Sequence, residues 1–175
     1  MGTRSAIGYK TPEGKIRAKY SHYDGYPACT GAILQDHYQE ARKIGQMVEL
    51  GDQSFLEEEI FPKGEHSFSK PEDGVTVFYG RDRGEPMEDV YYESKDEVPE
   101  WLLGYNPNGP WLKQHGVKAQ EFDTVQEFVD YYADAGCEYF YLHTTDGWIV
   151  HDRYGVGKDA NGYPVFDYLE NKLPA

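Results

Sequence analysis

The chain has 175 residues, with 17 basic against 31 acidic side chains and a formal net charge of −14 at pH 7. This balance argues against a broad nucleic-acid-binding face, because phosphate backbones are bound by clustered cations that release counterions. With 39% hydrophobic residues, no secretion signal and no run of about 18 apolar residues, the sequence predicts a soluble, cytoplasmic protein without a membrane span. The length favours one globular domain over residues 1–175.

The first predicted element is a β-hairpin, in which residues 5–10 and 15–22 flank the turn Thr11-Pro-Glu-Gly14. Proline presets φ in such a turn, and glycine tolerates a positive φ. We expect Lys10 to pair with Lys15.

This register places Ile7 opposite Ala18, so that apolar side chains share one face of the hairpin. It also brings Arg4 beside Ser21 and His22. The start of the chain and the end of the second strand should therefore meet in space.

Two helical segments are predicted next. Asp24-Gly25 ends the strand, and Pro27 suits the first turn of a helix that extends to about Tyr38. A second helix is expected over residues 39–50, where it ends at Gly51.

Residues 74–79 predict a strand, which is followed by the charged turn 80–85. Residues 86–121 contain four prolines and form a long irregular segment, with a short helix expected around residues 99–103. Such a segment inside a compact domain is more often functional or mobile than neutral.

Thr124-Val-Gln-Glu127 is a capping box, and it predicts a helix that ends at Gly136. A second hairpin should follow, with Asp146-Gly147 at the centre of its turn and Val150 opposite His143. The tail over residues 155–175 is expected to add a short helix or strand.

These elements predict an α+β fold. Two β-hairpins and the middle strand should form a sheet of about five strands, mainly antiparallel, with the helices packed on one face.

The candidate site centres on Ser-His-Tyr-Asp-Gly-Tyr-Pro, residues 21–27. His22 is a candidate general base that Asp24 would orient, and Arg4 would supply positive charge to a phosphate or carboxylate. The alternative is a plain turn, in which His22 caps the edge of the hairpin and Tyr26 packs against it.

A second basic feature is Arg81-Asp82-Arg83. Its two guanidinium groups would clamp a phosphorylated ligand, or they would pair with the neighbouring carboxylate on a surface turn, which is worth only ~0–1 kcal/mol. The predicted ligand-binding residues are Arg4, His22, Asp24, Tyr26, Arg81 and Arg83, with His22 and Asp24 as the catalytic candidates.

No metal, cofactor or covalent nucleophile is expected. The six histidines are scattered, and Cys29 and Cys137 should be reduced thiols without a disulfide. Gly155-Val-Gly157-Lys158 lacks the full phosphate-loop pattern. Paired tyrosines such as Tyr131-Tyr132 are either half-buried core residues or a surface on which nucleotide bases stack.

Several quoted stretches resemble a family of small proteins encoded mainly by tailed bacteriophages. These are Met1-Gly-Thr-Arg-Ser5, His22-Tyr-Asp-Gly-Tyr-Pro27, Ile33-Leu34, His37-Tyr38, Leu50-Gly-Asp52 and residues 74–85. The family's common form has Trp where this sequence has Tyr23. Some members are described as modifiers of suppressor tRNAs, which makes a tRNA element one expected ligand.

Three functions remain open at this point. The first is a phage accessory protein, for host takeover or counter-defence in the cytoplasm of the infected bacterium, that binds a phosphorylated or nucleotide-like ligand or a tRNA element. Its pocket would form where Arg4, His22 and Asp24 meet residues 81–85. The second is an acidic, non-catalytic inhibitor that docks on a basic host protein. The third is a metal-independent phosphodiesterase or nuclease with His22 as base. The oligomeric state is left open.

Overall fold

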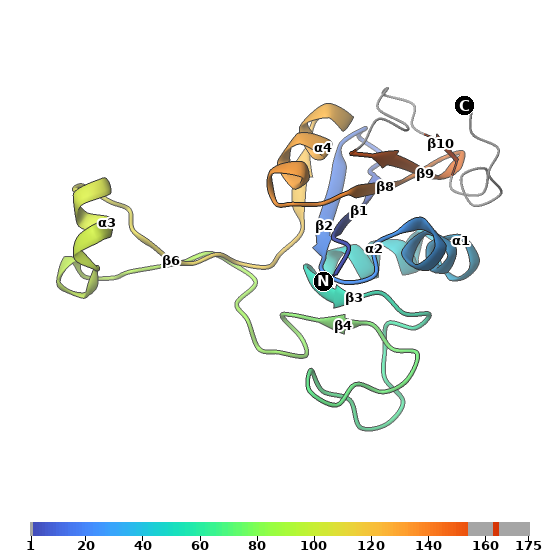
Figure 1. Ribbon diagram of the computed structural model, residues 1–175, viewed down its shortest axis with the longest axis horizontal. Coiled ribbons are helices and arrows are strands. Elements are labelled where there is room, and N and C mark those ends of the chain that lie inside the picture. Colours follow the sequence, from blue (N-terminus) through green and yellow to red (C-terminus); the bar gives the residue numbers. More distant parts are fainter. Residues whose placement is uncertain (1, 154–162, 165–175) are drawn as a thin grey trace.

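The computed structural model describes residues 2–153 and 163–164 (Figure 1). The strands are β1 (Ser5–Lys10), β2 (Ile16–Ser21), β3 (Gln53–Phe55), β4 (Val77–Phe78), β5 (Val90–Tyr91), β6 (Leu112–Gln114), β7 (Gln120–Phe122), β8 (Tyr139–Thr144), β9 (Gly147–Asp152) and β10 (Tyr163–Pro164). The helices are the π-helix η1 (Pro27–Gly31), α1 (Ala32–His37), α2 (Ala41–Glu49), the 3₁₀-helix η2 (Lys95–Glu97), α3 (Glu100–Tyr105) and α4 (Val125–Asp134). The α+β class is confirmed. Apart from β10, the expectations for residues 155–175 lie outside the described residues.

The main sheet has eight strands, so the expected number of about five is wrong. Its order is β10-β9-β8-β1-β2-β3-β4, and β7 also pairs with β2. Most pairs are antiparallel, but β1 with β8 and β2 with β3 are parallel, which makes the sheet mixed. The β2–β3 connection holds η1, α1 and α2, as a crossover between parallel strands requires.

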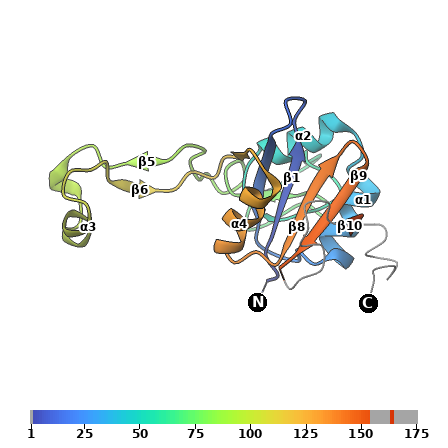
Figure 2. The ribbon, with the colours of Figure 1, turned by 90° about the horizontal axis from the view of Figure 1, so that it is seen from above.

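Helices cover both faces of this sheet, so the expectation that they pack on one face is wrong (Figures 1 and 2). Ile7 packs in one core cluster with Val48 of α2, whereas its neighbour Ala6 packs in another with Phe128 of α4. Successive side chains of a strand point to opposite faces. The first four residues of β1 are all buried, which is typical of a strand covered on both sides.

The β1–β2 hairpin forms as expected, but its register differs by one residue. Ile7 pairs with Lys19 and not with Ala18. The turn contains Gly14 at φ 84°, and a left-handed glycine after a type I turn is typical of a three-residue hairpin loop. A one-residue shift moves every side chain of β2 to the other face relative to β1. Lys19 therefore lies in the core.

Lys19 is fully buried. Its Nζ donates a hydrogen bond to the carbonyl of Met47 at 2.6 Å and lies 4.4 Å from the centroid of the Phe78 ring. Met47 belongs to the last turn of α2, where the helix dipole favours a positive charge. Burial nevertheless lowers the pKa of Lys19 well below its usual value, because the charged form loses its hydration.

The β8–β9 hairpin is also confirmed, with a register that differs by two residues. Thr145 and Asp146 form its turn, and Gly147 at φ 104° begins β9. Val150 therefore pairs with Tyr141 and not with His143. An even shift leaves each side chain on its expected face.

Residues 88–116 leave the body as an arm (Figures 1 and 2). The arm consists of the two-stranded ribbon β5–β6, with the predicted short helix, α3, at its tip. At its base, the backbone N–H of Gly116 donates to the Asp89 carboxylate at 2.7 Å. Residues 86–121, which the sequence predicts as a long irregular segment, thus contain an arm with its own strands and helix.

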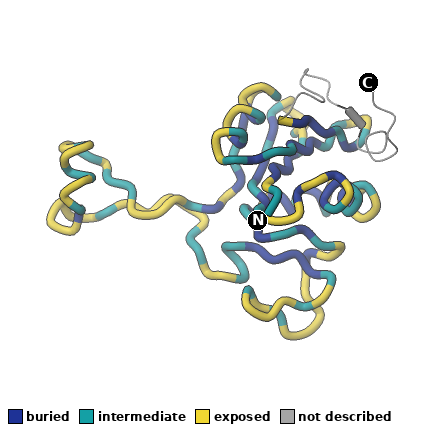
Figure 3. The backbone as a smooth tube through the Cα atoms, viewed as in Figure 1, coloured by how far each residue is buried: buried dark blue, intermediate teal, exposed yellow. Residues whose placement is uncertain are grey.

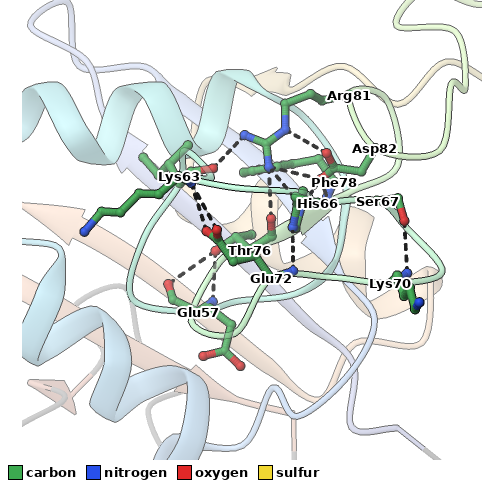
Figure 4. A network of polar contacts seen from close by, with 11 residues as sticks. Glu57, Lys63, His66, Ser67, Lys70, Glu72, Thr76, Phe78, Arg81 and Asp82 are labelled. Atoms are coloured by element: carbon green, nitrogen blue, oxygen red, sulfur yellow. Dashed lines mark hydrogen bonds and ion pairs between the residues drawn. The ribbon is translucent and has the colours of Figure 1, made fainter.

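The turn after β4 is held by Arg81 (Figure 4). Its Nε and Nη2 donate to the two carboxylate oxygens of Asp82 at 2.9 and 3.1 Å. Nη1 also donates to the carbonyl of Ile60 at 2.6 Å, and Nη2 donates to that of Thr76 at 3.1 Å. This guanidinium ties the loop between β3 and β4 to the end of β4.

His66 completes the network from the opposite side. Its Nδ1 accepts the backbone N–H of Glu72 at 3.0 Å, so the proton of the neutral ring is on Nε2, which lies 3.2 Å from Asp82. Burial alone would raise the pKa of Asp82. Hydrogen bonds from Arg81, the Phe78 N–H and His66 outweigh it and lower this pKa below its usual value.

We predict that Arg81→Ala lowers the free energy of unfolding by about 3 kcal/mol, because it leaves the Asp82 carboxylate buried without its main partner. Urea denaturation measures the change. The matched control is Arg83→Ala, whose side chain is 53% exposed and should change stability by less than about 1 kcal/mol. Equal losses in the two variants would contradict this structural role.

Candidate functional site

Arg4 and His22 lie together at the open end of the β1–β2 hairpin. They line a hollow of about 320 Å³. The other lining residues are Gly2, Tyr23, Gly136 and Glu138. Gly136 has φ 92°, and a Cβ there would lie 2.7 Å from Nη1 of Arg4. Glycine is therefore needed for the guanidinium to lie against this turn, and we call this site the Arg4 hollow.

Arg4 forms no ion pair among the described residues, although Glu138 lines the same hollow. Within residues 2–153 the ion pairs engage Arg17 and Arg81 with carboxylates, but none involves Arg4. Burial first, and then the charge of Arg4, lower the pKa of His22 below its usual 6.5. His22 is therefore mostly neutral at physiological pH, with its Nδ1 2.7 Å from the Tyr20 hydroxyl.

A larger cavity of about 530 Å³ adjoins this hollow. Its lining includes Tyr20, Asp52, Asp89, His115, Gly116, Lys118, Gln120, Tyr131, Tyr132 and Ala135. Tyr20 lines the cavity while its hydroxyl contacts His22 of the Arg4 hollow, and Ala135 and Gly136 are consecutive residues. The two sites are therefore neighbours, and we call the second the Asp52 cavity.

Hydrogen bonds hold both the backbone and the side chain of Asp52 in place. Its N–H donates to the carbonyl of Val117 at 2.7 Å, and one carboxylate oxygen accepts the N–H of Tyr20 at 3.0 Å. Burial raises the pKa of Asp52 from its usual 3.8 to about 7, with a smaller contribution from Glu85, although the Tyr20 N–H and Lys19 act against it. A cavity carboxyl that changes protonation near pH 7 is suited to proton exchange or to pH-dependent binding.

Tyr132 adds an unused hydroxyl to the same cavity. Its side chain is almost fully buried, at 2% exposure, and the hydroxyl has no hydrogen-bond partner within the described residues. Burial, followed by the charge of Asp52, raises its pKa well above the usual value. Buried polar groups are nearly always hydrogen-bonded, so a buried hydroxyl without a partner is unusual. Beside it, the half-exposed ring of Tyr131 packs edge-on at 4.9 Å between centroids.

The structure does not bring Asp24 and Tyr26 into either site. Asp24 is exposed in the turn after β2, with φ 57°, and its carbonyl accepts the hydroxyl of Thr30 at 2.8 Å. Among the described residues no hydrogen bond joins His22 to Asp24, and Nδ1 of His22 lies 2.7 Å from the Tyr20 hydroxyl. Tyr26 precedes η1 and is 41% exposed.

Arg81 and Arg83 also lie away from Arg4. The Arg81 guanidinium is committed to Asp82 and two carbonyls, as described above. Arg83 lies over the ring of Phe68 at 4.9 Å and is 3.9 Å from Glu85. Neither the Arg4 hollow nor the Asp52 cavity is lined by residues 80–85, so these two basic regions do not share one wall.

The sequence patterns gave Asp52 no functional role, and they named Tyr132 only within a tyrosine pair, as a core residue or as part of a base-stacking surface. The one available signal for Asp52 was a carboxylate directly after the helix-ending Gly51. No local pattern marked the Tyr132 hydroxyl as a buried group without a hydrogen-bond partner among the described residues. The cavity depends on the base of the arm, which no local pattern connects to β2.

Other chemistries find little support in the described residues. No group of three or more His, Cys, Asp or Glu side chains is placed to hold a metal ion among them. Both cysteines are free, and burial raises the pKa of the Cys137 thiol to about 12, which leaves it unreactive. No helix among these residues has the length and apolar character needed to span a membrane.

Comparisons of the chain with protein-family models, with curated proteins and with solved structures give no match. The argument for function therefore depends on the geometry of the two neighbouring sites.

We predict that the Asp52 carboxyl titrates with a midpoint of about 7. Carbon-13 chemical shifts of the carboxyl carbon, followed from pH 4 to 9, measure it. Because this pKa is raised in the folded state, the associated stability is present below pH about 4 and is lost as the pH rises through about 7. Asp52→Asn should remove this part of the pH dependence and make the protein more stable than wild type at pH 8. A midpoint below 5 would contradict the assignment.

Proposed function

We propose that this chain is a phage-encoded accessory protein that binds a phosphorylated, nucleotide-like ligand across the Arg4 hollow and the Asp52 cavity. The observation that carries the proposal is the unpaired Arg4 guanidinium beside a cavity with aromatic walls. A terminal nucleotide of a tRNA presents the same chemistry. The resemblance of the sequence to the tailed-phage family supports a role in host takeover or counter-defence.

The Arg4 hollow supplies the subsite for an anion. A guanidinium offers forked donors that match a phosphate. When Nδ1 of the neutral His22 ring accepts the Tyr20 hydroxyl, its Nε2–H is free to donate to a phosphate oxygen. In a protein of net charge −14, anions are repelled from most of the surface, so a local cation decides where one binds.

The Asp52 cavity supplies the subsite for a ring. Its volume of about 530 Å³ lies within the range of small-molecule sites, ~300–1,000 Å³. Tyr20, Tyr131 and Tyr132 give it aromatic walls, on which a base stacks without sequence preference. The Tyr20–His22 contact lies between the two subsites, and the proposed nucleotide places its phosphate in the hollow and its base in the cavity.

We predict that nucleoside monophosphates raise the melting temperature of the wild-type protein and that Arg4→Ala abolishes the shift, because the phosphate loses its cation. Differential scanning fluorimetry at low salt measures it. The control is Arg42→Ala on α2, an exposed arginine that lines neither site. The corresponding nucleosides, which lack phosphate, should give a smaller shift. No shift with any nucleotide would overturn the proposed function.

We also propose a second function, docking of the arm on a basic partner protein. Trp101 and Tyr105 of α3 are 73% and 87% exposed. Figure 3 shows that much of the arm's tip is exposed. Residues 88–116 hold six acidic side chains against two lysines. Exposed aromatic anchors within an acidic surface fit an apolar pocket with a basic rim.

We predict that Trp101→Ser combined with Tyr105→Ser abolishes salt-sensitive capture of a basic host protein by the immobilised full chain. Mass spectrometry of the bound material at low and high salt measures this. Phe61→Ser is the matched control, because Phe61 is 57% exposed but lies outside the arm. Capture that survives the double substitution, or a captured protein that is acidic, would contradict docking through the arm.

A further inference from the structure

The Tyr132 hydroxyl and the Asp52 carboxyl are two polar groups of the cavity that the fold leaves incompletely used. The hydroxyl has no partner within the described residues. One oxygen of Asp52 accepts the Tyr20 N–H, and the other has no hydrogen bond with the described residues. Both residues line the Asp52 cavity. Together they offer a ligand a combination of hydrogen-bond donors and acceptors.

Other polar groups of the cavity are already engaged. Asp89 accepts the N–H of Gly116 at 2.7 Å, and Lys118 forms an ion pair with Glu88 at 2.5 Å. Because Glu88 is paired with Lys118, the acidic groups that act on the cavity besides Asp52 are Asp89 and the nearby Glu85. Such surroundings favour a ligand edge that donates hydrogen bonds over one made of carbonyl oxygens.

The charged and titratable groups around Asp52 come from several elements. The charge of Lys19 favours the carboxylate, whereas that of Glu85 favours the protonated form. The remaining groups on the surrounding elements are Tyr20, Tyr79, Asp89, His115, Lys118, Tyr131 and Tyr132. With burial as the dominant effect, Asp52 carries a proton in about half of the molecules near neutral pH.

We propose that the carboxyl group of Asp52 and the hydroxyl of Tyr132, which line one cavity, recognise the amidine edge of a base, a ring nitrogen next to an exocyclic amine, as found in adenine and cytosine. This inference rests on the proposed function and names its ligand class. The carboxyl O–H donates to the ring nitrogen while the carboxyl group accepts one amine hydrogen. The hydroxyl oxygen of Tyr132 accepts the other amine hydrogen. Ring keto groups, as in hypoxanthine and uracil, would place oxygen against the negative surroundings.

Isothermal titration calorimetry with AMP, IMP, CMP and UMP tests the inference in matched pairs. At pH 6 the amine-bearing member of each pair should bind about tenfold more tightly than its keto counterpart, the discrimination expected of a bidentate contact. Between pH 6 and pH 8 the affinity for AMP should fall about tenfold, because a group with a pKa of about 7 loses most of its protons over that range.

Three substitutions separate recognition from a merely structural role. Asp52→Asn presents a donor and an acceptor at every pH, so AMP should bind this variant equally well at pH 6 and pH 8. Asp52→Leu should lose the preference for AMP over IMP. Tyr132→Phe should weaken AMP binding severalfold without loss of stability, because it removes a buried hydroxyl that has no partner.

The outcomes distinguish this inference from the function on which it rests. If all four nucleotides bind equally, with affinity that depends on Arg4 but not on Asp52, the proposed function stands and the inference is overturned. Tighter binding of AMP at pH 8 than at pH 6 would also overturn it. If no nucleotide binds the wild-type protein, both fail.

Discussion

The register of β2 against β1 is the constraint on which the rest of the structure depends. Gly14 at φ 84° closes a tight turn that pairs Ile7 with Lys19. This choice directs Lys19 into the core beneath α2 and turns Tyr20 and His22 toward the face covered by α4. With the pairing shifted by one residue, the wall between the Arg4 hollow and the Asp52 cavity would lie on the other face of the sheet.

The same register determines the electrostatics of the site. Lys19 is buried against a helix carbonyl and the Phe78 ring, and it lies close enough to Asp52 to favour its charged form. Desolvation works in the opposite direction and outweighs it, so the carboxyl changes protonation near neutral pH. Arg4, at the other end of the site, has no ion pair with the residues that the structure describes, in a strongly acidic protein. The site therefore combines a protonatable group with a fixed positive charge.

The arm connects the two proposed functions physically. Asp89 and Gly116 at its base line the Asp52 cavity, while Trp101 and Tyr105 are exposed at its far end. A partner bound to the arm would thus act on a segment that also forms part of the ligand site. Any such effect would be reciprocal, because the coupling free energy between two binding sites is shared by both.

Local patterns in the sequence determined the helices and hairpins of this protein. The capping box at Thr124, where the hydroxyl accepts the Glu127 N–H at 3.1 Å, marked the start of α4, and Arg4 was correctly placed beside His22. Turn chemistry and helix caps act over a few residues, so they can be recognised without the fold. Only the tertiary structure decided the parallel pairings, the helices on both faces and the cavity around Asp52. Its raised pKa comes from burial by segments far apart in the chain, and burial of that kind exists only once those segments have packed together.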